Sequence, residues 1–253
     1  MKIISWNING LRAIHKKGFL DWLHQEKPDI LGLQEIKAQE HQLSQEILAP
    51  KNYHTYFNPA ERKGYSGTAL YSKNQPKAVS NGLGIYEFDN EGRTQAAEFE
   101  DFILFNIYFP NGNSRQDRLQ YKLDFYEAAI KVFDKLVKQG KKLIIAGDYN
   151  TAHNPIDLAR PKENEHVSGF LPIERKWLDK LTKHGYIDCF RHFNKAPEHY
   201  TWWSFRTRAR ERNVGWRIDY FFVSKNLRSR LKNCFHLTNV MGSDHCPIVL
   251  EID

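Results

Sequence analysis

The segment Leu143-Ile144-Ile145-Ala146-Gly147-Asp148-Tyr149-Asn150 decides the fold. Its first four residues are all apolar, which is typical of a β-strand that is covered on both faces. Two polar side chains, Asp148 and Asn150, follow at a spacing of two residues. Because side chains alternate along a strand, these two project from the same face. The segment therefore predicts a buried strand with a carboxylate and an amide at its end.

Further strands and helices are predicted on both sides of this segment. Runs rich in Ile, Leu, Val, Phe and Tyr predict strands at 2–9, 29–37, 68–72, 94–99, 102–109, 142–150, 217–223 and 246–252. Helices are predicted at 18–26, 117–139 and 174–184. The helix at 117–139 has an apolar stripe of Leu119, Leu123, Tyr126, Ile130, Phe133 and Val137. No linker divides the chain, so we expect one α/β domain over residues 1–253, with two β-sheets covered by helices.

The composition excludes several classes of protein. Hydrophobic residues make up 41% of the chain, which is enough for a sizeable core. No apolar run approaches the ~20 residues of a membrane span. Three widely spaced cysteines exclude a disulfide scaffold and a Cys-x-x-Cys zinc site. The N-terminus has the pattern of a strand and not of a signal peptide, so we expect a cytoplasmic protein without membrane contact.

Positive charge is concentrated in one window, residues 200–235. This window holds nine Lys and Arg against two Asp and Glu, which equals the whole net charge of +7. The same window contains Tyr200, Trp202, Trp203, Phe205 and Trp216. A solvated surface is one explanation, but basic residues mixed with aromatic ones suit phosphates together with exposed bases or sugars. The window favours a nucleic-acid partner.

Five predicted strands carry polar residues at one end. These residues are Asn7 and Asn9, Gln34 to Lys37, Asn111, Asp148 and Asn150, and Ser243-Asp244-His245. Such residues commonly form turns. However, the ends of adjacent strands can meet at one edge of a sheet, where a rigid scaffold positions a site. Five ends that contain carboxylates and amides predict a catalytic site at that edge.

The polar segments carry a resemblance to a known family. They are WNINGLRA at 6–13, LQEIK at 33–37, GYSG at 64–67, YFPNG at 108–112, GDYN at 147–150, NVGWRIDY at 213–220 and GSDHCP at 242–247. In this order they resemble the exonuclease III family of apurinic/apyrimidinic (AP) endonucleases, within the endonuclease/exonuclease/phosphatase superfamily. The resemblance implies a four-layer α/β/β/α sandwich. It also implies a Mg²⁺-dependent enzyme of base-excision repair that cuts 5′ to abasic sites, with 3′→5′ exonuclease and 3′-end-cleaning activity.

The resemblance also implies four groups of site residues. The catalytic group is Tyr108, Asp148, Asn150, Asp219 and His245. The metal ligands are Asn7, Glu35, Asp148, Asn150, Asp244 and His245. The DNA contacts are Arg12, Lys37, Tyr65, Asn111, Asn113, Asn164 and Arg208. An abasic-sugar pocket is formed by Trp202, Trp216 and Ile218.

The chemistry of phosphodiester hydrolysis gives these residues roles. Glu35 is the expected main ligand, and hard oxygen donors suit one or two Mg²⁺ ions, with Mn²⁺ as a substitute. His245 acts as a base or as a donor to the phosphate, oriented by Asp219. Asp148 activates the water or protonates the leaving group, and both roles fit its place. Cys246 follows His245 on a strand and so faces the opposite side, which excludes a Cys–His nucleophile.

Two other functions compete with DNA repair. A phosphoesterase acting on inositol phosphates or lipids would share the same polar residues, but the basic aromatic window argues against it. A DNA-binding protein without catalysis would not need every carboxylate of the set. The expected partner is double-stranded DNA with abasic sites or blocked 3′ ends, bound by a monomer.

Overall fold

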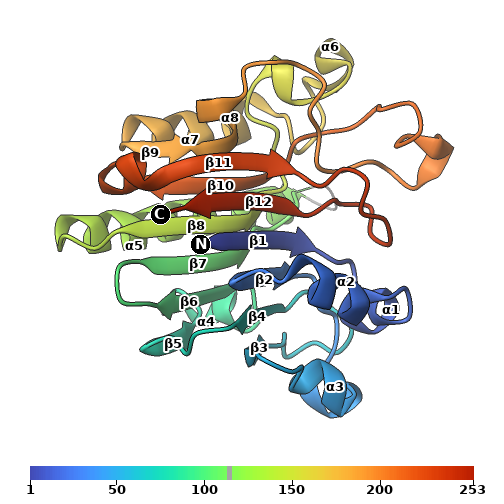
Figure 1. Ribbon diagram of the computed structural model, residues 1–253. Helices are drawn as coiled ribbons and strands as arrows, with labels where there is room; N and C mark the ends of the chain where they lie inside the picture. Colours follow the sequence, from blue (N-terminus) through green and yellow to red (C-terminus); the bar gives the residue numbers. More distant parts are fainter. Residues whose placement is uncertain (113–115) are drawn as a thin grey trace.

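Two six-stranded β-sheets pack face to face (Figure 1) in the computed structural model, which describes residues 1–112 and 116–253. The first sheet has the order β11 (Leu231–His236), β12 (Ile248–Ile252), β1 (Lys2–Asn7), β2 (Ile30–Gln34), β4 (Thr68–Ser72) and β3 (His54–Asn58). The second has the order β5 (Ala78–Asn81), β6 (Thr94–Glu98), β7 (Ile103–Tyr108), β8 (Leu143–Asp148), β10 (Asp219–Ser224) and β9 (Tyr186–Asp188). The pairs β1–β2 and β7–β8 at the sheet centres are parallel, and the other pairs are antiparallel.

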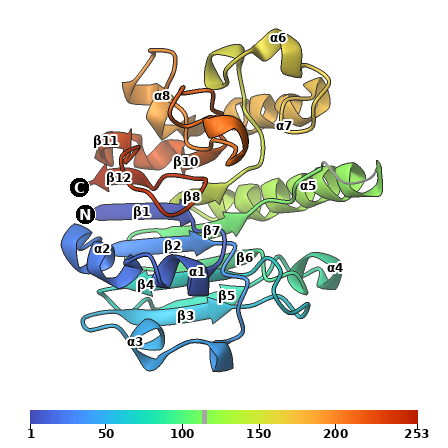
Figure 2. The same ribbon diagram turned by 90° about the vertical axis from the view of Figure 1, so that its right-hand side faces the viewer.

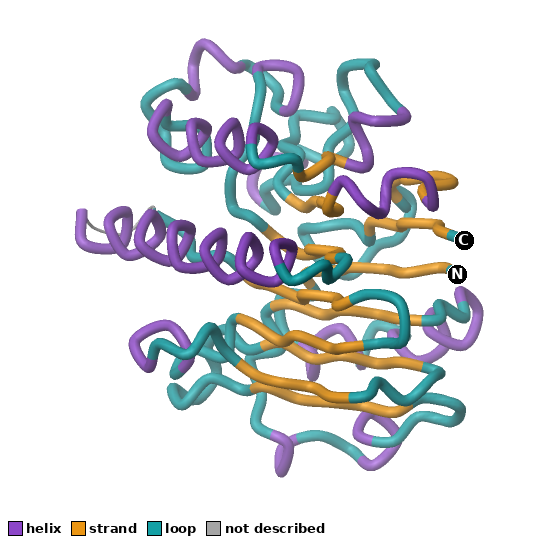
Figure 3. Tube along the Cα trace, turned by 90° about the vertical axis from the view of Figure 1, so that its left-hand side faces the viewer, coloured by secondary structure: helices purple, strands orange, loops and turns teal. Residues whose placement is uncertain are grey.

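Helices cover the outer faces of the two sheets. Helices α1 (Leu11–His15) and α2 (Phe19–Glu26) lie on one side, and α5 (Gln116–Lys138) and α7 (Pro172–Lys183) lie on the other (Figures 2 and 3). The short helices are α3 (Gln45–Leu48), α4 (Tyr86–Asp89), α6 (Pro161–Asn164) and α8 (Cys189–Phe193), with 3-10 turns at Glu40–Gln42, Pro155–Asp157, Arg206–Arg208 and Lys225–Arg230. Among the helices of the described residues, none is long and apolar enough to cross a membrane. The predicted four-layer α/β sandwich is confirmed.

Three apolar clusters separate the four layers. The middle one lies between the sheets and includes Ile3, Leu104, Ile144, Phe221 and Leu250. A second cluster packs the first sheet against α1 and α2, and a third packs the second sheet against α5 and α7. Consecutive residues of β8 pack against different layers: Ile144 faces the other sheet, and Ile145 faces the helices. This explains why the segment is apolar without alternation.

The sequence predicted the buried strands but not the more exposed ones. All eight predicted strands are present, whereas β3, β5, β9 and β11 had no strand prediction. These four are the edge strands of the two sheets, and each contains partly or fully exposed positions, so its apolar signal is weak. In α5 the buried face also includes Phe125, Ala129 and the fully buried Lys122, while Leu119 is only half-buried. A lysine in this position cannot be predicted from apolar spacing.

The backbones of β7 and β8 approach each other closely at Gly147. Its φ is +143°, and a Cβ atom there would lie 1.8 Å from the Ile107 carbonyl oxygen. Gly147→Ala should therefore lower the free energy of unfolding by about 3 kcal/mol or more. Gly140→Ala is the control, because φ at Gly140 is also positive but a Cβ there meets no atom within 4 Å. Chemical denaturation of both variants measures the difference, and equal losses would contradict the steric explanation.

Candidate active site

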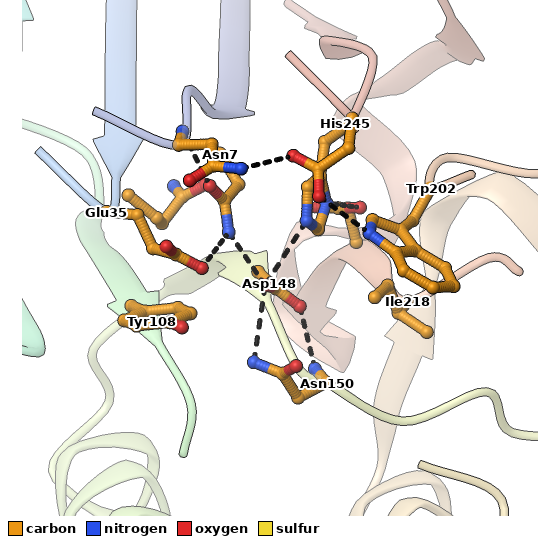
Figure 4. Close-up of polar contacts among 12 residues, drawn as sticks. Asn7, Glu35, Tyr108, Asp148, Asn150, Trp202, Ile218 and His245 are labelled. Atoms are coloured by element: carbon orange, nitrogen blue, oxygen red, sulfur yellow. Dashed lines mark hydrogen bonds and ion pairs between the residues drawn. The ribbon is translucent and has the colours of Figure 1, made fainter. Parts of the chain in front are cut away.

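Six strands bring their polar ends to one edge of the sandwich. The carboxyl ends of β1, β2, β7 and β8 lie there, and because β10 and β12 run antiparallel to their neighbours, their first residues lie there too. In the register of the second sheet, Asp148 is paired with both Tyr108 and Asp219. Figure 4 shows the resulting group, with Asp148 between Asn7, Asn150 and His245. The predicted convergence of polar strand ends is confirmed.

Asn7 with Asn9, and Asp148 with Asn150, form two turns of the same kind. The backbone N–H of Asn9 donates to the side-chain oxygen of Asn7 at 3.1 Å, and that of Asn150 donates to Asp148 Oδ1 at 2.8 Å. Asn9 and Asn150 have left-handed φ values of 49° and 51°. Such backbone costs about 1–3 kcal/mol and persists only where its surroundings hold it. The turns fix the side chains of Asn7 and Asp148 toward the site.

His245 and Asp219 form a buried pair. His245 Nδ1 lies 2.9 Å from Asp219 Oδ2, which also accepts a hydrogen bond from the Thr201 hydroxyl at 2.6 Å. Burial alone would lower the pKa of His245, but the negative charges of Asp219 and Asp148 outweigh it and raise that pKa to about 10. The imidazole is therefore a cation at neutral pH, held in one orientation by Asp219.

Asp148 is the central carboxylate. It is 1% exposed, accepts a hydrogen bond from Asn7 Nδ2 at 2.9 Å, and lies 3.9 Å from His245 Nε2. Burial raises the pKa of Asp148 to about 7, although the His245 charge opposes the shift. A carboxyl group with this pKa can accept or release a proton near neutral pH.

Glu35 lies on the other side of Asn7, whose amide nitrogen donates to Glu35 Oε1 at 3.1 Å. The ammonium group of Lys37 lies 2.5 Å from Glu35 Oε2 and donates to the side chain of Asn9 at 2.6 Å. Burial alone would raise the pKa of Glu35, but the charge of Lys37 and the hydrogen bonds from Lys37, Tyr108 and Asn7 together outweigh burial, so the net pKa is lowered. Glu35 is thus an ionised carboxylate that already holds a cationic group.

The side chains of Asp148, Asp219 and His245 offer ligand atoms within 4.8 Å of one another, but His245 could bind a metal ion only after losing its proton. Asp219 Oδ1 is a buried oxygen without a hydrogen-bond partner. The oxygens of Glu35 and Asp148, joined through Asn7, form a second group of donors beside it. Oxygen donors predominate in both groups, so the site fits a hard divalent cation.

A cleft of about 550 Å³ opens above these residues. Its lining includes Glu35, Tyr108, Asn111, Asp148, Asn150, Asn164, Trp202, Trp216, Ile218, Asp244 and His245. The rings of Trp202 and Trp216 meet edge to face with centroids 6.4 Å apart. Trp202 Nε1 donates to Asp244 Oδ2 at 3.1 Å, which turns Asp244 toward the indole. The cleft therefore joins the charged residues to an apolar wall.

Of the predicted DNA-contacting residues, Asn111 and Asn164 line this cleft, whereas Tyr65 and Arg208 line two other hollows of the surface. Arg12 and Arg208 are exposed, and Lys37 is paired with Glu35. The amide group of Asn164 donates to the carbonyl of Arg160 at 2.9 Å. Tyr65 accepts hydrogen bonds from Arg93 and Arg118, and Asn111 donates to Asn150 Oδ1 at 3.2 Å. Asn113 lies outside the described residues.

Two further residues belong to the site: Asn9 was predicted only as a polar strand-end residue without a role, and Thr201 was not predicted. Asn9 joins Lys37 to Asp244, and Thr201 holds Asp219. Asn9 carried a usable signal, because it repeats the spacing of Asp148 and Asn150. Thr201 carried none, since a single threonine before two tryptophans has no distinguishing pattern. Cys246 is fully buried, as predicted.

Residues 4–245 match the Endonuclease/Exonuclease/phosphatase family. An exodeoxyribonuclease of Bacillus subtilis (strain 168) is 44% identical over 255 residues, covering 100% of both chains. A DNA-(apurinic or apyrimidinic site) endonuclease of Dictyostelium discoideum is 41% identical over 256 residues, covering 100% of this chain and 71% of its own length. The structure of a 3′ phosphatase from Neisseria bound to a product DNA hairpin superposes with a TM-score of 0.92 at 28% identity, covering 100% of this chain and 99% of the other.

The family match covers residues 4–245, and the structural superposition covers the whole chain, so sequence and fold indicate the same family. The chain belongs to the Endonuclease/Exonuclease/phosphatase family. Within it, the relatives at 41–44% identity are an exodeoxyribonuclease and an AP endonuclease, which confirms the resemblance to the exonuclease III type.

The Asp219–His245 pair predicts a pH-dependent stability. A His with a raised pKa contributes stability that is complete below its ordinary value of 6.5 and is lost as pH rises through about 10. Asp219→Asn should lower the free energy of unfolding by about 3 kcal/mol or more near neutral pH. The difference in free energy of unfolding between the parent protein and the variant should decrease as pH rises through about 10. Urea denaturation in EDTA measures it, and a gap that is constant with pH would contradict the assigned pair.

Asp179→Asn is the matched control for this measurement. Asp179 Oδ1 lies 2.8 Å from His153 Nε2, but the Asp179 side chain is 52% exposed. An exposed pair contributes about 1 kcal/mol or less, so this variant should be nearly as stable as the parent protein.

Proposed function

We propose that the chain is a DNA-repair phosphodiesterase that cuts the backbone 5′ to abasic sites in duplex DNA and removes nucleotides and blocking groups from 3′ ends. The exodeoxyribonuclease and AP endonuclease among its full-length relatives support this function. The observation that carries it is the place of Asp148, 3.9 Å from the His245 that Asp219 holds, below a wall of Trp202 and Trp216. One cleft therefore combines hydrolytic groups with apolar surface for a base-less sugar.

We assign distinct roles to His245 and Asp148 from the directions in which their pKa values are shifted. Because His245 is protonated at neutral pH, it donates to a phosphate oxygen and does not act as the base. Asp148, with a pKa of about 7, takes a proton from the attacking water. The water oxygen bonds to phosphorus as the bond from phosphorus to the 3′ oxygen breaks. That oxygen takes a proton from solvent water and leaves as a 3′-hydroxyl, the proton on Asp148 returns to solvent, and the abasic sugar keeps the 5′ phosphate.

Neighbouring side chains position these groups. Asn150 holds Asp148 through its backbone N–H and its amide group. Tyr108 has a pKa raised well above its ordinary value by burial and by the charge of Glu35, so its phenol stays protonated and can donate to the phosphate. Preorganised donors of this kind stabilise charge that develops in the transition state.

Mg²⁺ is the proposed cofactor, with Mn²⁺ as a substitute, in one or two positions. Glu35, Asn7 and Asp148 would hold it, with Asp244 and Asn150 near, and the proposal rests on their oxygen donors. When bound, Mg²⁺ polarises the phosphate and stabilises negative charge in the transition state. Lys37 would leave Glu35 as the ion enters and become available to a DNA phosphate.

The remaining features of the function are part of the same proposal. Residues 1–253 would act as one domain and a monomer in the cytoplasm, on DNA with abasic sites or blocked 3′ ends. Arg12, Lys37, Tyr65, Asn111, Asn113, Asn164 and Arg208 would contact the DNA. Trp202, Trp216 and Ile218 would enclose the extruded sugar, because an unpaired, base-less nucleotide costs least to extrude.

The test is cleavage of an end-labelled duplex with one abasic site, resolved on a denaturing gel. The protein should cut 5′ to the site with Mg²⁺ and should be inactive in EDTA. Asp148→Asn should slow single-turnover cleavage by about 10²-fold or more while leaving DNA binding intact. Asp179→Asn is the control and should cut like the parent protein. No cleavage by the parent protein, or near-parental cleavage by Asp148→Asn, would refute the proposal.

The metal assignment has its own prediction. Glu35→Ala should raise the Mg²⁺ concentration needed for half-maximal activity by about tenfold or more, with partial recovery at high Mg²⁺, because a ligand has been removed. Glu46→Ala removes an exposed carboxylate that pairs with His15 and should leave the Mg²⁺ dependence unchanged. A Mg²⁺ titration of cleavage rate measures both, and equal dependence in the two variants would remove Glu35 from the metal site.

A further inference from the structure

A buried ion pair connects the two outer helices of the second sheet. Lys122 of α5 and Glu174 of α7 are both 0% exposed, and Lys122 Nζ lies 2.7 Å from Glu174 Oε1. The two helices run side by side along the sheet (Figure 3). An ion pair removed from water gains little stability by itself, because the desolvation of both charges offsets their attraction. Its other contacts therefore indicate what it does.

Lys122 contacts the loop that follows the catalytic strand. Its ammonium group donates to the Asn150 carbonyl at 2.8 Å and to the Thr151 hydroxyl at 2.7 Å. Asn150 is the left-handed residue whose N–H and amide group hold Asp148. Lys122 thus contacts the same peptide segment that holds Asp148, and it fixes the direction of the Asn150 carbonyl.

Glu174 contacts the loop that forms the cleft wall. Its carboxylate accepts hydrogen bonds from the Ser168 hydroxyl at 2.9 Å and from the backbone N–H groups of Gly169 at 2.6 Å and Leu171 at 3.1 Å. Gly169 packs against the Trp216 ring, because a Cβ atom there would lie 3.1 Å from the indole. Glu174 therefore holds the loop on which the Trp216 wall rests.

An apolar pair could not make both sets of contacts. The Asn150 carbonyl needs a donor, while the two N–H groups of the 168–171 loop need an acceptor. An apolar pair of equal volume would fill the same space and leave these buried groups without partners. The opposite charges of Lys122 and Glu174 satisfy each other as well as the two loops.

We propose that Lys122 and Glu174 are positioning residues that set the catalytic loop at Asn150 in register with the sugar-pocket wall at Trp216. The inference rests on the proposed function, since it concerns the geometry of the same cleft. Neither residue reaches the substrate. The pair acts through Asn150 on one side and through Gly169 on the other, so it should affect the chemical step far more than the binding of DNA.

The experiment separates this role from simple stabilisation. Lys122→Met keeps the length of the side chain and removes its charge, and the double variant Lys122→Met/Glu174→Gln removes both charges. In Lys122→Met, an unpaired buried carboxylate should lower the melting temperature, which the double variant should largely restore. Single-turnover cleavage of abasic duplex should nevertheless remain about 10²-fold slow in both, because the Asn150 carbonyl has lost its donor. The Kd for the same duplex in EDTA, measured by fluorescence anisotropy, should stay within about threefold of the parent value.

The control pair joins the same helices. Lys180 of α7 and Glu127 of α5 form a half-exposed ion pair at 2.6 Å without contacting either loop. Lys180→Met should cut at the parental rate. If cleavage recovers together with stability in the double variant, or if Lys122→Met cuts within about twofold of the parent, the positioning role is wrong. If Lys122→Met does not fold, the double variant alone decides by its rate. Failure of the parent protein to cut abasic DNA would instead refute the proposed function.

Discussion

The hydrogen bond from the Asn7 amide to Asp148 at 2.9 Å joins the two sheets at the point where the chemistry takes place. It forms between central strands of different sheets, β1 and β8, and between residues 141 positions apart. It can exist only if the two sheets pack with the carboxyl ends of β1 and β8 at the same edge. The apolar layer between the sheets supplies the energy for that arrangement. Glu35, Asp219 and His245 reach the site through strands paired with these two.

Burial of charge at this edge gives the site its reactivity. Three carboxylates, Glu35, Asp148 and Asp219, lie within a small region and would repel one another without cations. The positive charge of Lys37 offsets the negative charge of Glu35. The positive charge of His245 offsets the negative charges of Asp148 and Asp219. The result is one carboxyl group that titrates near neutral pH and one imidazole that stays protonated. The carboxylates can bind a divalent cation, and the cationic groups can bind an anionic phosphate. This edge of the two sheets is therefore suited to the hydrolysis of phosphodiesters.

Polar contacts between layers restrict how the sandwich can pack. Between the sheets, Gln34 donates to Asn106 at 2.7 Å, and Asn106 donates to the Ala69 carbonyl at 2.9 Å. Apolar surfaces alone would tolerate small sliding movements of one sheet over the other, whereas buried hydrogen bonds are satisfied in only one register. Lys122 and Glu174 add the same kind of constraint between the helices and the catalytic loop. Each layer is therefore tied to the strand ends that carry the site.

The sequence by itself determined the buried strands, the long helix and the polar residues at the strand ends, because burial on one or two faces leaves a local periodic pattern. The spacing of Asp148 and Asn150 predicted two side chains on one face of a strand, whereas β8 ends at Asp148 and Asn150 lies in the turn that follows. Tertiary structure alone decided which of these residues meet. His245 meets Asp219, 26 residues away, only because the first sheet, which carries β12, packs against the second sheet, which carries β10. Thr201, which holds Asp219, has no local signal. The same is true of Lys122, whose charge predicts exposure while its partners Glu174 and Asn150, from two other segments, make burial possible. Local pattern records how deeply a residue is buried, whereas the identity of its partners depends on contacts that form only when distant segments pack together.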